Sequence, residues 1–368
     1  SLIKDAHRVS AGGAITAAEA VMKNEVNRSF ALVRPPGHHA MRVVHGTRGF
    51  CTVNIEAVMV EYLRRHYGIR RVAIVDTDVH HGDGTQDIYY HDPDTLFISF
   101  HQDGRTLYPG SGFTNETGSP GALLSTINLP LPPGTGDAGF HAVLDEFVLP
   151  VLADFQPEII INSAGQDNHY SDPLANMAVT AQGYARLTEK LKADVAVLEG
   201  GYSIEDALPY VNVGIILAMA GLDYSRVIEP DIREAPQQSA ATTRHIGELI
   251  RNWQQTWSDR DRLKAEALAK TGDVWTRERS IYYDDSRIME QQSETIRYCR
   301  RCNGVLTIST ESGGSRSRGN TAFAAVVGPE ACPECRARAK EAVVWAKRQG
   351  RHRHYILQDR REDTTERL

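Results

Sequence analysis

The sequence predicts an α/β protein in which helices cover a mostly parallel β-sheet, followed by a small cysteine-bearing domain. Two observations predict this fold class. Short apolar segments alternate with helical segments through the first part of the chain, and four cysteines form two close pairs near its C-terminal end. Strands that alternate with helices imply a mostly parallel sheet with helices on its faces.

Length and composition set the bounds on this protein. Its 368 residues suffice for one large α/β domain and an appendage. A hydrophobic content of 41%, a charged content of 24% and a net charge of −6 are typical of soluble globular proteins. No segment is long enough to span a membrane, so we expect no membrane partner. The chain begins at Ser1 without a signal peptide or initiator Met, which leaves room for a missing N-terminal part.

The first elements are a helix at 6–24 and a strand at 30–34, followed by a proline-rich loop that ends in His38 and His39. Each proline fixes its own φ and restricts the residue before it, so the loop is extended. Two histidines on a rigid loop can serve as a general-base pair, because the histidine pKa lies near neutrality. Taken alone, surface histidines are the commoner interpretation of such a loop.

An amphipathic helix at 53–67 leads into an apolar strand that ends in a run of charged residues. The run contains Asp76, Asp78, His80 and Asp83. Residues two apart on an extended segment point the same way, so Asp78 and His80 can contact one ion. A carboxylate and an imidazole are zinc ligands, and a catalytic zinc needs one more protein ligand. A solvated loop is the alternative interpretation of this stretch alone.

The next units repeat the alternation and supply the missing ligand. We expect strands at 95–100, 125–129, 158–162 and 194–198, with helices at 138–155 and 180–192. Asp167 follows the third of these strands and can complete a site of two aspartates and one histidine. Two glycines after the last strand allow a tight turn, which leaves the Tyr202 hydroxyl free to point into the site. A half-buried core tyrosine is the alternative.

The C-terminal part differs in composition. Residues 226–296 are polar, and we expect a helical connection packed on the core, so the predicted domains are 1–225, 226–296 and 297–368. A glycine- and serine-rich hairpin tip is expected at 313–319. Two Cys-x-x-Cys pairs on either side of it predict a zinc ribbon with a closed structural zinc and a reducing, cytoplasmic compartment, with disulfides as the alternative. The four predicted ligands are Cys299, Cys302, Cys332 and Cys335.

A basic segment ends the chain. It includes an expected helix at 334–349, and from residue 291 onward there are fifteen Lys and Arg residues against nine Asp and Glu residues. Such a surplus can bind an acidic macromolecule. A solvated basic face is the more common outcome, because few aromatic residues interleave with the charges.

Five short motifs, taken together, resemble the zinc-dependent histone deacetylase superfamily. They are RPPGHHA (34–40), GFC (49–51), DTDVHHGDG (76–84), SAGQD (163–167) and LEGGY (198–202). Their order and spacing are similar to class II deacetylases and bacterial relatives, including acetylpolyamine amidohydrolases, over about residues 1–225. The resemblance implies an arginase/deacetylase-like fold.

The resemblance also implies a role for each matching residue. Asp78, His80 and Asp167 would bind the catalytic zinc. His38 and His39 would lie beside the metal, backed by Asp76 and Asp83, and Tyr202 would polarise the acyl carbonyl. The residues expected to contact substrate are Gly49, Phe50, Tyr108, Leu174 and Gly201, and those expected to hold a monovalent cation, K⁺ or Na⁺, are Asp76 and Ser99.

The implied function is a zinc amidohydrolase that removes an acyl group, acetyl first, from lysine side chains of a protein or peptide, or from a small acylated amine. An acyl-lysine-binding module without turnover and an acetylpolyamine amidohydrolase are the alternatives. Leu174 weakens the polyamine alternative, because that branch carries a glutamate there. Two further departures stand out. Gln166 stands where an apolar or aromatic residue is commoner, and the 33 residues before Arg34 are too few to place the rim acid that would hold the substrate backbone.

Overall fold

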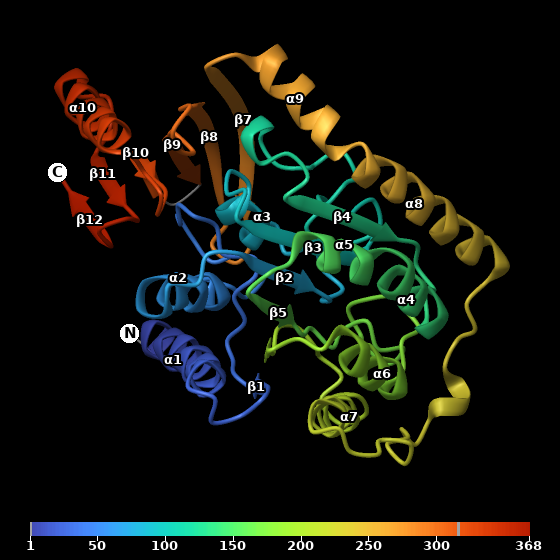
Figure 1. The fold of residues 1–368 in the computed structure, drawn as a ribbon. Coiled ribbons are helices and arrows are strands. Elements are labelled where there is room, and N and C mark those ends of the chain that lie inside the picture. Colours follow the sequence, from blue (N-terminus) through green and yellow to red (C-terminus); the bar gives the residue numbers. More distant parts are fainter. Residues whose placement is uncertain (1, 315–316) are drawn as a thin grey trace.

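The predicted parallel sheet forms the centre of the computed structural model, which describes residues 2–314 and 317–368. Six parallel strands lie in the order β1-β6-β5-β2-β3-β4 (Figure 1), which confirms the predicted fold class. In chain order the strands are β1 (Ser29–Ala31), β2 (Val72–Asp76), β3 (Thr95–Gln102), β4 (Thr126–Leu131), β5 (Ile159–Ser163) and β6 (Val195–Val197).

Helices cover both faces of this sheet. One face packs against α1 (Leu2–Met22) and α2 (Ile55–Tyr67) through a buried apolar cluster. A larger cluster joins the other face to α4 (Asp137–Val143), α5 (Leu149–Phe155), α6 (Ala181–Leu191), α7 (Leu208–Met219) and α8 (Ala240–Ser258). A π-helical turn links α4 to α5, so the helix expected at 138–155 is continuous.

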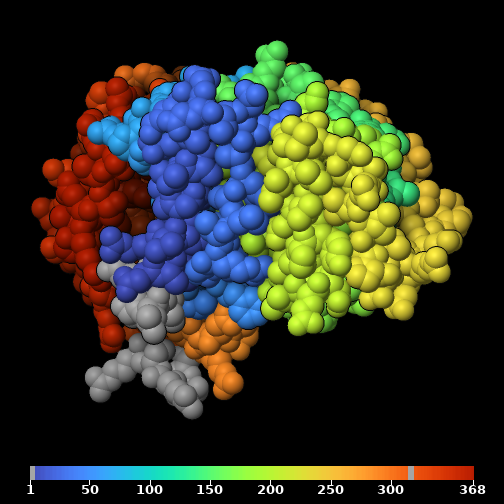
Figure 2. Space-filling view, turned by 90° about the horizontal axis from the view of Figure 1, so that it is seen from below, coloured from blue at the N-terminus to red at the C-terminus, as the bar shows by residue number. Residues whose placement is uncertain are grey.

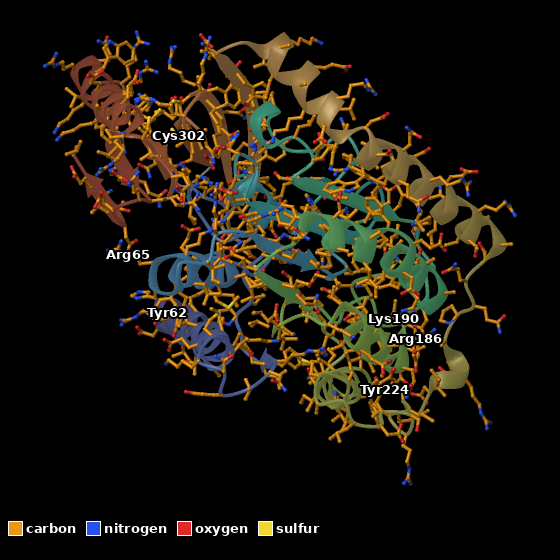
Figure 3. The ribbon with its side chains drawn as sticks, in the orientation of Figure 1. Tyr62, Arg65, Arg186, Lys190, Tyr224 and Cys302 are labelled. Carbon is orange, nitrogen blue, oxygen red and sulfur yellow. The ribbon has the colours of Figure 1, made fainter. Side chains whose placement is uncertain are left out.

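Side chains on the outer surface join neighbouring elements within each layer (Figure 3). The Tyr62 hydroxyl of α2 donates a hydrogen bond to Glu19 of α1 over 2.8 Å. The Tyr224 hydroxyl, in the segment after α7, donates to Glu189 of α6 over 2.7 Å. Among the described residues, no helix combines the length and the apolar character that crossing a membrane requires.

Strand register places the carboxyl ends of the central strands side by side. Asp76 at the end of β2 pairs with Ser99 of β3 and with Ser163 of β5. The loops that follow these parallel strands therefore leave the sheet at one edge, where open α/β sheets place their ligands. A short helix, α3 (Asp83–Tyr89), begins within the charged run that follows β2.

The helical connection predicted for residues 226–296 is wrong in its last part. Helix α9 (Arg260–Thr271) ends the helical segment, and β7 (Val274–Tyr283) and β8 (Ile288–Arg297) then form an antiparallel hairpin. Along β7, exposed residues alternate with less exposed ones, which is the period of a strand with one solvated face. The many polar residues on that face had suggested a surface helix.

The hairpin belongs to a second, mixed sheet of six strands, in the order β12-β11-β10-β9-β8-β7. The remaining strands are β9 (Val305–Gly314), β10 (Ser317–Val327), β11 (His354–Asp359) and β12 (Thr364–Arg367), and α10 (Pro333–Gln349) packs on one face. The helix expected at 334–349 is thus confirmed. The hairpin tip expected at 313–319 lies in part outside the described residues, at 315–316. The expected small ribbon is part of this larger sheet.

Partly buried polar contacts join the second sheet to the first domain. Arg360 donates two hydrogen bonds to Glu61 of α2, at 2.9 and 2.6 Å, and lies 3.5 Å from Asp92. Figure 2 shows the red C-terminal residues beside the light-blue residues of α2. Arg360, close to both Glu61 and Asp92, therefore joins the loop after β11 to the first domain.

Candidate metal centre and active site

Three predicted metal ligands converge at the carboxyl edge of the parallel sheet. Asp78 and His80 follow β2, Asp167 follows β5, and one ligand atom from each lies within 4.8 Å of the other two. The Nδ1 atom of His80 is 3.2 Å from Asp78 Oδ1 and 3.1 Å from Asp167 Oδ2. All three side chains are buried.

Backbone groups hold the two carboxylates in place. The Gly200 N–H donates to Asp78 Oδ2 over 2.7 Å, and the Val79 N–H donates to Asp167 Oδ1 over 2.9 Å. A Cβ atom at Gly200 would lie 2.1 Å from Asp167 Oδ2. Only glycine permits this close approach, which explains one of the two glycines before Tyr202.

The donor set fits a zinc ion. Two carboxylates and an imidazole are zinc ligands, and three protein ligands leave a position open, as in catalytic sites. Burial, reinforced by Asp78, raises the Asp167 pKa to about 7. Burial disfavours the charged form of His80, yet Asp167 and Asp78 outweigh it and raise the His80 pKa to about 10. Asp78 contributes to raising both pKa values, so its negative charge acts at the position where a cation would bind.

The adjacent histidines of the proline loop lie beside this cluster. The Nδ1 atom of His38 is 3.1 Å from Asp76 Oδ2, and that of His39 is 2.8 Å from Asp83 Oδ1. Burial disfavours the charged form of His38, but Asp78 and Asp76 outweigh it and raise its pKa well above the usual value. Burial and the neighbouring His38 lower the pKa of His39 to about 4, so its ring is neutral near pH 7.

Arg48 is a part of this arrangement that sequence reasoning missed. Its Nε atom donates to Asp83 Oδ2 over 3.0 Å. Burial acts to raise the Asp83 pKa, but Arg48 and His39 outweigh it and hold that pKa well below its usual range. The only signal in the sequence is a basic residue directly before the GFC motif, which is not specific.

Two buried glutamates were also missed. Glu199 accepts hydrogen bonds from the Gly37 and His38 N–H groups, at 3.0 and 3.3 Å, and burial raises its pKa to about 7. Glu56 accepts from the Ser163 hydroxyl over 2.6 Å, and burial raises its pKa well above the usual value. The sequence offered a signal for Glu199, which belongs to the LEGGY motif. It offered none for Glu56, which lies in α2 outside any motif.

Aromatic rings and glycines predicted to contact substrate gather around the metal ligands. The Tyr108 ring centroid is 5.2 Å from that of His39, and the Tyr202 centroid is 6.4 Å from His80 and 5.8 Å from Phe50. A Cβ at Gly49 would lie 2.4 Å from a ring carbon of His39. The structure therefore brings these residues together.

The loop that carries Tyr202 is anchored on both sides. The Tyr202 N–H donates to Asp172 over 2.7 Å, and Arg34 donates to the Gly201 carbonyl over 2.8 Å. Leu174, a residue that is 44% exposed, follows Asp172 by two residues and donates its N–H to that carboxylate. Leu174 thus lies on the segment that holds Tyr202.

The structure places two further residues that the sequence singled out: Ser99, whose role in binding a cation stays a prediction, and Gln166. Ser99 is buried, and its hydroxyl oxygen is 2.8 Å from His101 Nδ1, in register with Asp76 on the next strand. The unusual Gln166 is also buried, and its amide donates to Asn212 of α7 over 2.5 Å. The amide therefore bonds to a helix rather than filling an apolar contact beside Asp167.

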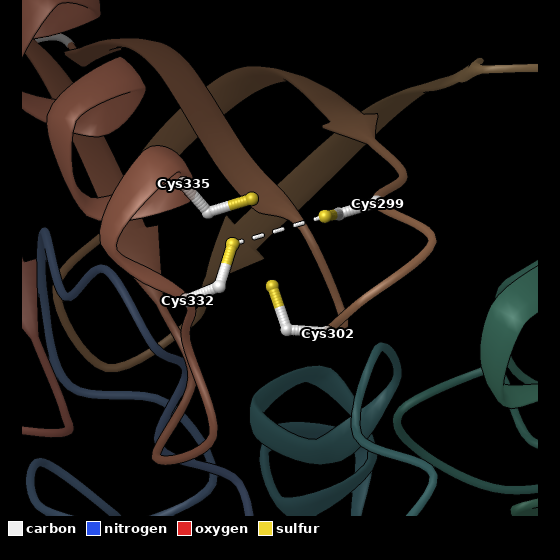
Figure 4. Close-up of side chains that lie close together, drawn as sticks. All are labelled: Cys299, Cys302, Cys332 and Cys335. Atoms are coloured by element: carbon white, nitrogen blue, oxygen red, sulfur yellow. Dashed lines mark hydrogen bonds between the residues drawn. The ribbon is translucent and has the colours of Figure 1, made fainter.

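The four C-terminal cysteines form a second metal-site candidate (Figure 4). Cys299 and Cys302 lie between β8 and β9, Cys332 and Cys335 lie at the start of α10, and their sulfur atoms are within 4.8 Å of one another. Cys299 Sγ is 3.9 Å from Cys332 Sγ, far beyond a disulfide bond of about 2 Å. The Arg301 N–H lowers the Cys299 pKa to about 6, which favours the thiolate that zinc binds.

We expect Cys302→Ser to lose one zinc ion per chain and to lower the melting temperature. Four thiolates fill a structural zinc site, and structural zinc contributes directly to folding. Elemental analysis and thermal unfolding measure both effects. The matched control is Cys51→Ala, at a buried cysteine outside the cluster, which should keep its zinc content. An unchanged zinc content in Cys302→Ser would contradict this site.

The parallel sheet, with a buried Asp-His-Asp cluster, paired histidines and a tyrosine at its carboxyl edge, defines an α/β protein with a candidate mononuclear metal centre. The chain belongs to the histone deacetylase domain family, which matches residues 1–215.

Similar proteins agree with this assignment. A probable deacetylase of Archaeoglobus fulgidus is 50% identical over 232 residues, which cover 61% of this chain and 63% of that protein. An acetylpolyamine amidohydrolase of Burkholderia pseudomallei is 40% identical and covers 53% and 57% of the two chains. The crystal structure of the HDA15 HD domain matches with a TM-score of 0.60, 32% identity and 72% coverage of each chain. The chain thus spans about half to two thirds of the length of the curated relatives it matches.

Proposed function

We propose that this protein is a zinc-dependent amidohydrolase that removes an acyl group, acetyl first, from a lysine side chain or a related acylated amine. The observation that carries the proposal is the Asp78-His80-Asp167 cluster, with the His39–Asp83 pair and Tyr202 beside it. The names of the relatives, a probable deacetylase and an acetylpolyamine amidohydrolase, support the same chemistry.

Asp78, His80 and Asp167 would hold the catalytic zinc, and the four cysteines would hold a structural one. Bound at the first site, zinc supplies a Lewis acid for the acyl carbonyl and lowers the pKa of water toward neutrality. Asp76 and Ser99 would contribute to a site for K⁺ or Na⁺.

His39 is suited to accept the proton of the attacking water. Asp83 accepts the Nδ1 proton of His39, so Nε2 carries the free lone pair. The ion pair with Arg48 keeps Asp83 ionised, and Asp83 therefore orients the ring and stabilises its charged form. His38, held by Asp76, would return a proton to the departing amine.

Tyr202 is suited to stabilise the oxyanion that forms on the acyl carbon. Burial and the nearby Asp167 carboxylate raise the pKa of Tyr202, so its hydroxyl stays protonated and can donate a hydrogen bond. The anchors at Asp172 and Arg34 fix the loop before the reaction begins, and a preorganised donor needs no reorganisation during it.

The test is an assay of the purified chain on acetyl-lysine peptides, acetylpolyamines and longer acyl-lysines. We expect release of the free amine, loss of turnover after treatment with a chelator, and recovery when zinc is added back. Turnover that persists after the zinc is removed would contradict the proposal. Binding of acylated peptides without any turnover would instead indicate a recognition module.

The basic C-terminal segment would let the protein bind an acidic macromolecule as a second partner, with binding that weakens as salt increases. The chain would act in the cytoplasm, where thiols that bind zinc stay reduced.

A further inference from the structure

We infer that the turn joining β7 and β8 in the second sheet forms one wall of the candidate active site, and that Asp284 in this turn positions Gly49 and Tyr108 for substrate binding. The inference rests on the proposed function, because it assigns a positioning role in that reaction. It extends the site to a part of the chain beyond the residues that match the deacetylase domain family, which end at 215.

Residues 48–51 form the tight turn that this wall supports. Arg48 and Cys51 exchange two backbone hydrogen bonds, at 3.0 and 2.8 Å, and Gly49 and Phe50 between them have φ values of 50° and 65°. Because the flanking residues close the turn, the N–H groups of Gly49 and Phe50 are left without partners inside it. Each needs an acceptor from elsewhere.

Two aspartates of the β7–β8 turn supply these acceptors. The Gly49 N–H donates to Asp284 Oδ1 over 3.1 Å, and the Phe50 N–H donates to Asp285 Oδ2 over 2.9 Å. A third contact joins the two loops nearby, where the Thr47 N–H donates to the Ser286 hydroxyl oxygen over 2.8 Å. Hydrogen bonds to ionised carboxylates are stronger than neutral ones, so the second sheet holds this turn firmly.

Asp284 also contacts a second residue beside His39. The Tyr108 hydroxyl donates to the same Asp284 Oδ1 over 3.1 Å. The Tyr108 ring lies edge-on to the His39 ring, with their centroids 5.2 Å apart, and a Cβ atom at Gly49 would lie 2.4 Å from the same His39 ring. One carboxylate oxygen therefore fixes the spacing between two groups that flank the proposed base.

The turn is itself rigidly placed. Tyr283 pairs with Ile288 across the hairpin, and its hydroxyl oxygen lies 2.9 Å from the Val43 carbonyl oxygen and 2.7 Å from a Glu290 carboxylate oxygen, either of which can accept its proton. The Tyr282 carbonyl accepts a hydrogen bond from Arg48, the residue that binds Asp83. The β7–β8 hairpin of the second sheet therefore contacts Arg48, Gly49 and Tyr108, the residues around His39.

The test compares Asp284→Ala with wild type on an acyl substrate that the wild type turns over. We expect KM to rise roughly tenfold while kcat changes much less. Gly49 and Tyr108 would lose the carboxylate that holds them in place, whereas the His39–Asp83 pair would keep its hydrogen bond. Asp284→Asn keeps an acceptor oxygen, so its KM should stay close to the wild-type value. Tyr108→Phe should raise KM as well, and combining it with Asp284→Ala should add little, because both remove the same contact.

A second readout does not depend on turnover. Hydrogen exchange followed by mass spectrometry should show faster exchange in the peptide containing Gly49 for Asp284→Ala. The matched control is Asp273→Ala, an exposed aspartate at the other end of the hairpin, which should change neither exchange nor KM. If the wild type turns over no acylated amine, the proposed function fails and this inference with it. If the wild type is active but Asp284→Ala and Tyr108→Phe leave KM unchanged, the inference alone is overturned.

Discussion

Replacing Asp167 with Asn should remove the catalytic zinc and lower kcat/KM by about 10³-fold or more. The side chain keeps its shape and an oxygen to accept the Val79 N–H, so the fold should survive. It loses the negative charge that, with Asp78, would hold the metal. A catalytic metal supplies several kcal/mol of transition-state stabilisation, and each 1.36 kcal/mol is a factor of ten in rate.

Elemental analysis should find about two zinc ions per wild-type chain and one in Asp167→Asn, the remaining ion being the one at the cysteines. Asp145→Asn is a matched control, since it changes an aspartate on the far helical layer that pairs with Lys190. A wild-type content of one zinc that Asp167→Asn leaves unchanged would refute the catalytic metal site.

Replacing Tyr202 with Phe should lower kcat by roughly 10²-fold or more while zinc stays bound. Loss of one oxyanion donor has an effect of this size in other hydrolases. The ring would keep its contacts with His80 and Phe50, and the anchoring hydrogen bonds of the loop come from the backbone. The defect should therefore appear in kcat rather than in KM or in stability.

Tyr224→Phe provides the comparison for this experiment, because it also removes one tyrosine hydroxyl, here one that donates to Glu189 at the surface near α6. It should turn over substrate at the wild-type rate. A Tyr202→Phe enzyme with wild-type kcat would show that another group stabilises the oxyanion, and the assignment of Tyr202 would be wrong.

Local patterns in the sequence predicted the parallel sheet and most of its candidate site. The apolar strand that ends at Asp76 leads into polar residues, as do the other strands, and parallel strands align these ends at one edge of a sheet. Asp78, His80 and Asp167 were therefore expected at the same edge, and the pairing of β2 with β5 brings them together. The two Cys-x-x-Cys pairs likewise predicted a four-sulfur cluster, because that spacing is itself the geometry of a zinc knuckle.

The same reasoning failed at residues 274–297 for a physical reason. Strands of a sheet with one solvated face carry many polar residues, so β7 and β8 look like a surface helix until their partners are known. A strand is stabilised by neighbours distant in sequence, here β9 beyond the first cysteine pair. Composition alone does not carry that information.

The tertiary structure alone decided which side chains support the predicted site. Arg48, Asp284 and Glu56 carry no local pattern, and their roles follow from contacts across the chain, such as the 235 residues that separate Gly49 from Asp284. The sequence by itself predicted the strands and the polar residues at their carboxyl ends, because each strand and the residues that follow it are close together in the chain. The folded chain then brought Asp167 next to His80, which is 87 residues earlier. The walls around those ligands depend on how two sheets pack, and only the folded chain fixes that.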